Sequence, residues 1–416
     1  MSELDKTALH KLCDRIDSYV EEAVNIQRTL TAIPALAPEN GGEGEHEKAR
    51  VLRAYLQNEL HCDEIDLYNA PDERVSSGTR PNIVARLKGR SQARTLWLMS
   101  HMDVVPPGDL SKWSSDPWTV RVEDGKIYGR GTEDNQQGIV SSLLASKAFR
   151  DEGFAPACDV GLLLVADEET GSKYGIQFLL QQHKDLFSHD DLIIIPDAGN
   201  ADGTLVEVAE KSILWFKFTV LGKQTHGSTP ELGINAFKAG AALVVKLNQL
   251  YEIYDAVNPV FDPPISTFEP TRKEANVPNI NTIPGEDIFC FDCRILPEYQ
   301  VASLEESVKK ICREVEQSHQ VKVEVSLEQL LEAPPPTSVD APVVKAIQAG
   351  IQEIKGIGSK PMGIGGGTVA AFFRQAGFPA VVWATQDETL HEPNEYVKID
   401  NILTDAKVFA YVALRS

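Results

Sequence analysis

The sequence predicts an α/β protein with a mainly parallel sheet, into which a smaller α+β sandwich domain is inserted. Near-continuous apolar runs alternate with segments of helical periodicity, and charged residues follow each apolar run. A block of alternating strand pattern interrupts this order after residue 208. Strands that are buried on both faces are apolar along their whole length, so the alternation favours a sheet covered by helices on both sides.

Helical periodicity predicts helices over residues 5–32, 45–60 and 136–153, the last of which closes on a glycine. The apolar runs predict buried strands at 95–100, 159–166, 192–196 and 379–384. The inserted domain is expected at 209–329, which leaves 1–208 and 330–416 for the larger domain. Within the insertion, strands are expected at 212–222, 287–296 and 321–329, and helices at 233–254 and 303–317.

The composition argues against several classes of partner. The chain has 416 residues and a net charge of −21, which argues against binding to nucleic acid or to an anionic membrane. No apolar run approaches the roughly 20 residues that span a bilayer. The N-terminal segment is charged and amphipathic and lacks the apolar core of a signal peptide, so a cytoplasmic protein is expected.

Two of the six cysteines, Cys290 and Cys293, form a C-x-x-C pattern inside a predicted strand. Positions i and i+3 of a strand face opposite sides, so the two thiols cannot converge on one ion. We therefore expect ordinary reduced cysteines and not a zinc or redox site.

Histidine and carboxylate residues follow every predicted buried strand. They are His101 and Asp103 after the first, Asp167, Glu168 and Glu169 after the second, Asp197 after the third, and Asp387, Glu388 and His391 after the fourth, with Glu133 and Asp134 in a glycine-rich turn at 128–138. Each alone is also typical of a solvated loop. Because open α/β sheets bind ligands outside the carboxyl ends of their strands, the recurrence predicts one site. Histidine with carboxylates and no cysteine suits Zn²⁺, Co²⁺ or Mn²⁺, and the surplus of carboxylates permits two bridged ions.

The motifs SHMDVVP, GRGTEDNQQG, ADEETGS, PDAG and LHEPNEYV occur in this order over residues 100–395. They resemble the motifs of the M20 family of co-catalytic metallopeptidases and deacylases, which includes acetylornithine deacetylases, succinyl-diaminopimelate desuccinylases, carboxypeptidases and dipeptidases. The resemblance implies a metal-dependent hydrolase of peptide or N-acyl amide bonds in small amino-acid-like substrates. It also implies two divalent ions per chain, with Zn²⁺ as the first expectation and Co²⁺ or Mn²⁺ as alternatives.

The alternative from another class is a non-hydrolytic metal-containing module that binds an amino-acid-like ligand. Glu168 argues against it, because the resemblance makes this residue the general base and a binding module has no use for a base.

The resemblance also assigns the ligands. His101 and Asp197 would hold one ion, Glu169 and His391 would hold the other, and Asp134 would bridge the two.

Asp103 would orient the imidazole of His101. Aspartate at position 197 favours the aminopeptidase and dipeptidase members of the family over its deacylases and carboxypeptidases.

In the inserted domain the resemblance implies a lid that also joins two subunits into a homodimer. His226, in THGSTPELGINA, would stabilise the oxyanion, usually in the site of the other subunit, although an exposed loop histidine is the alternative. Asn281 and Arg294 would bind a substrate carboxylate, with a surface ion pair as the alternative for Arg294. Gly367 and Thr368 would donate hydrogen bonds to the same carboxylate.

One family loop departs from its usual pattern. Val369 and Ala370 stand where the family often has Ser-Asp, which weakens the match to the acetylornithine deacetylase and desuccinylase subgroup.

Overall fold

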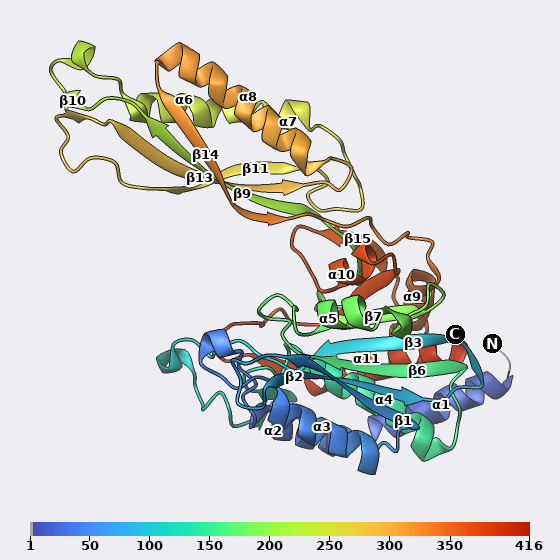
Figure 1. Cartoon of the computed structure of the whole chain (residues 1–416). Helices are drawn as coiled ribbons and strands as arrows, with labels where there is room; N and C mark the ends of the chain where they lie inside the picture. The colour runs from blue at the N-terminus through green and yellow to red at the C-terminus, as the bar shows by residue number, and fades with distance from the viewer. Residues whose placement is uncertain (1–2) are drawn as a thin grey trace. The chain divides into compact units, whose positions relative to one another are not determined.

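The computed structural model describes residues 3–416, and the chain packs as two compact units (Figure 1). The first unit contains the residues up to Val208 together with Thr337–Pro361 and Phe372–Ser416. The second contains Ala209–Pro336 and Met362–Ala371, so it takes in slightly more of the chain than the predicted insertion. The roles expected for the two domains, catalysis and lid, stay predictions, because packing defines units and not functions.

The first unit is built on an eight-stranded sheet with the order β1-β2-β6-β3-β7-β16-β8-β15. The strands of this sheet are β1 (Glu64–Pro71), β2 (Thr79–Leu87), β3 (Ser91–His101), β6 (Cys158–Val165), β7 (Leu192–Asn200), β8 (Leu205–Glu210), β15 (Lys360–Ile364) and β16 (Ala380–Thr385). The end of β8 and most of β15 belong to the residues of the second unit. The four predicted apolar runs become β3, β6, β7 and β16, which pair in parallel at the centre, while β1, β2 and β8 pair antiparallel at the flanks. The predicted fold class is confirmed. A small separate sheet has the order β17-β5-β4, from β4 (Arg121–Glu123), β5 (Lys126–Tyr128) and β17 (Tyr396–Lys398).

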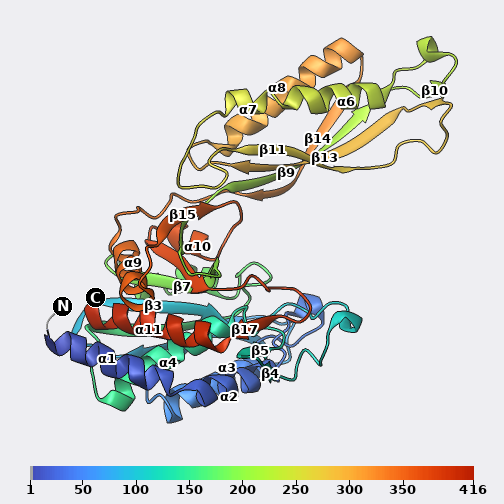
Figure 2. The ribbon, with the colours of Figure 1, turned by 180° about the vertical axis from the view of Figure 1, so that it is seen from behind.

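The helices of this unit are α1 (Glu3–Asp17), α2 (Val20–Thr31), α3 (His46–Asn58), α4 (Gln136–Glu152), α5 (Ile176–Gln182), α9 (Pro342–Lys355), α10 (Ala370–Gln375), which continues into the second unit, and α11 (Ile399–Arg415). α1, α4 and α11 contact one another, and α4 packs on β3, β6 and β7 (Figures 1 and 2). The single helix expected over 5–32 is two helices. The chain breaks at Ser18, whose hydroxyl donates to the Arg15 carbonyl and so competes with the helical hydrogen bonds.

The second unit is a sheet of four antiparallel strands, ordered β11-β13-β9-β14 and packed against helices. Its elements are β9 (Ser212–Leu221), β10 (Thr225–His226), α6 (Ala236–Leu247), α7 (Leu250–Ile253), β11 (Thr267–Lys273), β12 (Thr282–Ile283), β13 (Glu286–Ile295), α8 (Val301–His319) and β14 (Lys322–Leu331). The helix expected over 233–254 is therefore divided into α6 and α7. The sequence did not reveal β11, because this edge strand buries only Phe268 and contains Pro270, which is tolerated at an edge.

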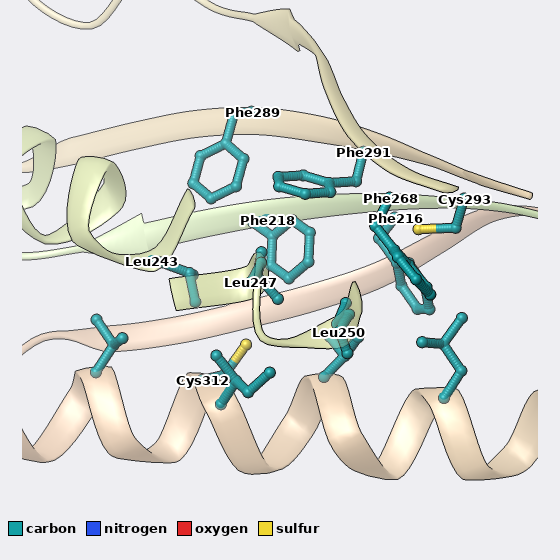
Figure 3. Close-up of a cluster of buried hydrophobic side chains, with 14 of the residues drawn as sticks. Phe216, Phe218, Leu243, Leu247, Leu250, Phe268, Phe289, Phe291, Cys293 and Cys312 are labelled. Carbon is teal, nitrogen blue, oxygen red and sulfur yellow. The ribbon is translucent and has the colours of Figure 1, made fainter. Parts of the chain in front are cut away.

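Aromatic side chains fill the space between the sheet and helices of the second unit (Figure 3). Phe218 of β9 stacks on Phe289 of β13 with ring centroids 5.0 Å apart. Alternate residues of both strands are buried, as expected for a sheet with one covered face. Cys293 is buried while Cys290 is only partly so, consistent with their opposite faces, and both are free thiols.

No helix in the described part of the chain has the length and apolarity to cross a membrane.

Candidate metal centre

The predicted ligands lie at the point where the order of the parallel strands reverses. β3 comes first in the chain, β6 is added on one side of it, and β7 is added on the other. The pairing of β3 with β7 covers only Leu96–Leu98 against Leu192–Ile194, so the two strands separate before they reach their carboxyl ends. This switch point is the position at which open α/β sheets bind their ligands.

A bulge in β7 displaces Asp197 from the regular strand pattern. Val382 of β16 pairs with Ile195, but Ala384 pairs with Gly199, so β7 carries extra residues around Asp197. Bulges redirect side chains next to functional sites. The amide of Asn135 donates to the carbonyl of Pro196 at 2.8 Å and to the Asp197 carboxylate, which holds the bulge against the turn that contains Asp134.

The structure brings all five predicted ligands together as two groups. In the first, Nε2 of His101 lies 2.9 Å from Oδ1 of Asp134 and 3.3 Å from Oδ1 of Asp197. In the second, Nε2 of His391 lies 3.0 Å from Oδ2 of Asp134 and 3.2 Å from Oε2 of Glu169. Asp134 belongs to both groups and turns one carboxylate oxygen toward each. The peptide bond between Asp134 and Asn135 is cis.

Asp103 connects the end of β3 to the loop that follows β6. Its carbonyl lies 3.1 Å from Nδ1 of His101 and its carboxylate 3.4 Å from the same atom. The carboxylate also accepts the backbone N–H groups of Glu168 at 3.1 Å and Glu169 at 3.0 Å. Asp103 therefore orients the His101 ring and also fixes the backbone beside the predicted base.

Negative charge is concentrated at this site. Burial, together with the charge of Asp197, raises the pKa of Glu168 well above its ordinary value. Burial and the neighbouring Asp134 raise the pKa of Glu169 to about 6. Hydrogen bonds to Asp134 and Glu169 raise the pKa of His391 to about 10.

These residues fit divalent metal ions. The carbonyl of Asp103 can only accept, so it accepts the proton on Nδ1 of His101 and leaves Nε2 facing the carboxylates of Asp134 and Asp197. A cation bound between them would take the place of a proton on Nε2. The donor separations of 2.9–3.3 Å suit a tetrahedral ion, whose ligands at roughly 2.0–2.2 Å stand about 3.3 Å apart. Oε1 of Glu169 is buried and has no hydrogen-bond partner among the described residues.

The sequence analysis did not identify Glu395, whose fully buried carboxylate binds the turn that carries Asp134. The sequence did contain a signal for Glu395, because it stands four residues after the predicted ligand His391 in the same motif.

His226 and Asn281 lie together in the second unit. β10, which ends at His226, pairs with β12, and the carbonyl of Asn281 accepts the N–H of Gly227 at 2.6 Å. The backbone N–H of Ser228 donates to Nδ1 of His226, so the ring proton is on Nε2. His226 is exposed and presents an N–H donor.

Arg294 and the glycine-rich loop lie near the far end of β13. The guanidinium donates twice to Asp292 and once, at 2.7 Å, to the carbonyl of Gly365, which uses three of its five N–H groups. The N–H and hydroxyl of Thr368 both donate to Glu210. Gly367 is part of the same loop, and Leu331 would lie 2.6 Å from a Cβ at this position. The two Thr368 groups that were expected to donate to a substrate carboxylate therefore already donate within the chain.

Comparison with known proteins gives the same class of protein as the fold and the site. Residues 97–415 match the model of peptidase family M20/M25/M40. An uncharacterized metallohydrolase of Methanococcus maripaludis is 42% identical over 420 residues, covering 94% of this chain and 98% of its own. A succinyl-diaminopimelate desuccinylase of Delftia acidovorans is 26% identical, with 92% and 95% covered. The crystal structure of human carnosine dipeptidase 1 has a similar fold, with a TM-score of 0.71, 19% identity and 98% of each chain covered.

The fold, the site and these relatives define a metal-dependent hydrolase. The chain belongs to peptidase family M20/M25/M40. The predicted family and class of enzyme are confirmed, and the alternative of a non-hydrolytic module has no support in these comparisons.

Removal of divalent metal should lower the thermal stability of the protein, because the buried carboxylates around Asp134 then repel one another. A ligand that binds only the folded state contributes about 2.7 kcal/mol at a hundred times its Kd. The measurement is the melting temperature before dialysis against a chelator, after dialysis, and after Zn²⁺ is returned. Equal melting temperatures in all three states would contradict a metal centre at this position.

Proposed function

We propose that this hydrolase is a dinuclear enzyme that cleaves peptide or N-acyl amide bonds in small amino-acid-like substrates. Zn²⁺ is the first candidate ion, and Co²⁺ and Mn²⁺ are the alternatives. The observation that carries the proposal is the position of Asp134, whose two oxygens lie 2.9 Å from His101 and 3.0 Å from His391. A carboxylate shared in this way suits two ions about 3.5–4 Å apart.

His101, Asp134 and Asp197 would hold one ion, and Asp134, Glu169 and His391 the other. When bound, the ions supply Lewis-acid polarisation of the scissile carbonyl and acidify a water.

Glu168 would take a proton from the attacking water at its carboxylate and return it to the leaving amine. Asp103 supports this role, because it accepts the backbone N–H groups of both Glu168 and Glu169 and so fixes a base beside a ligand.

The substrate class rests on the relatives and on the resemblance. Relatives named as a desuccinylase and a dipeptidase support a small substrate with an amide bond. Asp197 favours the aminopeptidase and dipeptidase members, and the absence of the Ser-Asp pair at Val369 and Ala370 weakens the match to the deacetylase and desuccinylase subgroup. Arg294 keeps two N–H groups that the Asp292 and Gly365 bonds do not use, and it remains our candidate for a substrate carboxylate.

The inserted unit supports a homodimer. His226 and Asn281 lie before the start of β13, whereas Arg294 lies near its end. Eight residues of strand separate Glu286 from Arg294, a distance of roughly 26 Å at 3.3 Å per residue. Asn281 and Arg294 of one chain therefore cannot grip one small carboxylate, whereas residues from two chains can.

Helix α6 supports the same proposal. It exposes Phe237 by 50% and Val245 by 69%, eight residues apart on the helix surface. We propose that this face joins two copies and that His226 donates to the oxyanion in the partner's site.

The charge and the cysteines of the chain bear on its cellular location and its partners. We propose a cytoplasmic enzyme with no nucleic-acid or membrane partner, which the net charge of −21 and the six free cysteines support.

Replacing Glu168 with Gln should lower kcat by about 10²–10⁴-fold, the usual contribution of a general base, while folding and metal content stay unchanged. The assay is amine release from a pooled library of dipeptides and N-acyl amino acids, with and without chelator. Glu392→Gln is the control, because this exposed carboxylate is next to His391 in sequence. A Glu168→Gln enzyme with normal turnover would rule out the assignment, and a wild-type enzyme that hydrolyses none of the library would refute the substrate class.

Elemental analysis under metal-replete conditions should find two divalent ions per chain. His391→Ala should lose chiefly one of them, because this residue belongs to only one of the two groups that share Asp134. A single ion in the intact protein would be inconsistent with a bridging role for Asp134.

Mixing two inactive variants, His226→Ala and Glu168→Gln, should restore some activity if His226 acts in the partner's site. Hybrid dimers would then contain one site with both residues intact. The experiment needs subunit exchange, which native mass spectrometry of the mixture can verify. Confirmed hybrids without activity would place His226 in the site of its own chain or outside catalysis.

A further inference from the structure

We propose that Glu133 is a positioning residue that fixes the loop carrying His391, and that it thereby sets the affinity of the second metal group separately from the first. The second group is Asp134, Glu169 and His391, and the His391 loop is the segment 386–395 between β16 and β17. The inference rests on the dinuclear site proposed above. It concerns a carboxylate that holds no ion in that proposal.

Glu133 binds the His391 loop through three hydrogen bonds. Its side chain is buried, and its residue is only 1% exposed. One carboxylate oxygen accepts the N–H of Asp387 at 2.7 Å. The other accepts the N–H of Thr389 at 2.5 Å and the hydroxyl of the same residue at 2.7 Å. All three donors belong to the segment just before His391.

Glu395 makes the reverse connection, from the His391 loop back to the turn. Its carboxylate accepts the backbone N–H groups of Gly131 at 3.0 Å, Glu133 at 2.9 Å and Asp134 at 3.0 Å. It also accepts a 2.6 Å bond from Arg130. The turn thus gives the Glu133 carboxylate to the backbone of the His391 loop, and the loop gives the Glu395 carboxylate to the backbone of the turn. Asp134, the proposed bridging ligand, directly follows Glu133.

The His391 loop also has other hydrogen bonds, such as the 3.2 Å bond from Arg130 to the His391 carbonyl, but the bonds to Glu133 come from the residues directly before His391. The side chain of His391 is 55% exposed, whereas that of His101 is 1% exposed. The backbone of Glu388, His391 and Asn394 adopts positive φ angles of 60°, 62° and 64°. His101, by contrast, ends a strand at the centre of the sheet. Ligand groups held in place before the ion arrives bind it more tightly.

The two carboxylates should affect the two metal groups differently. The three donors to the Glu133 carboxylate all lie in the His391 loop, so Glu133→Gln should loosen the second group alone. Glu395 holds the N–H of Asp134, a ligand shared by both groups, so Glu395→Gln should weaken both. Glutamine keeps the size and shape of the side chain but turns an NH₂ toward donors that need an acceptor.

The experiment titrates metal-free protein with Zn²⁺ in chelator-buffered solutions and follows the two binding constants. Glu133→Gln should raise the Kd of the second ion by about 10–100-fold, the usual effect of losing a group that orients a ligand, and change the first by less than about threefold. Glu395→Gln should raise both. Hydrogen exchange of the Asp387 and Thr389 amides in metal-free Glu133→Gln protein should accelerate, which reports on the loop without any metal.

Asp191→Asn is the matched control. Asp191 is also a buried carboxylate with three donors, namely the N–H groups of Thr95 and Ser188 and the indole of Trp97. It lies at the amino ends of β3 and β7, opposite the site, so this variant should lose stability and keep both binding constants. If Glu133→Gln does not fold, Thr389→Val removes one of the three bonds and should shift the second Kd in the same direction by less.

Equal weakening of both ions in Glu133→Gln, an unchanged second Kd, or unchanged exchange of the two amides would overturn the proposal. Failure of the proposed function has a different result. If Glu133→Gln weakens only the second ion while the wild-type protein hydrolyses no amide, the role of Glu133 stands and the proposed substrate class is refuted.

Discussion

The shared carboxylate of Asp134 is the point on which the geometry of the site depends. Its two oxygens face two histidines that come from distant parts of the chain, His101 at the end of a central strand and His391 in a loop near the C-terminal helix. The sheet positions only His101, and the pairing of strands does not bring His391 to Asp134. The turn that contains Asp134 must therefore be fixed against both, and much of the surrounding structure does this.

Burying so many carboxylates requires compensating positive charge nearby. Arg80 and Glu45 form a fully buried pair, with Nε of Arg80 2.6 Å from the Glu45 carboxylate. Glu45 also accepts the N–H of Asp167, the residue before the predicted base. Lys48 is buried close to Asp103, and burial lowers the pKa of its ammonium group to about 8. Removing one partner of such a buried pair costs about 3–5 kcal/mol, so the support is also part of the fold's stability.

The second unit has a different design. Aromatic side chains form the core beneath its sheet (Figure 3). In this sheet, Asn281 precedes the start of β13 and Arg294 lies near its end. The length of β13 suits the proposed dimer, in which the residues at its two ends would serve different active sites. The physical basis of the proposed dimer is therefore the length of one strand and not the presence of an apolar surface alone.

The sequence by itself determined the four central strands and the residues at their carboxyl ends, because a strand buried on both faces leaves an apolar run that ends where polar chemistry begins. It also predicted the ligand types, since His101, Asp134, Asp197 and their partners stand within short, readable motifs. Only the tertiary structure decided which oxygen of Asp134 faces which histidine, and that Glu133 and Glu395 tie two segments more than 250 residues apart. It also placed Asn281 and Arg294 at opposite ends of β13. Such contacts depend on how loops close in three dimensions, and periodicity along the chain carries no information about them.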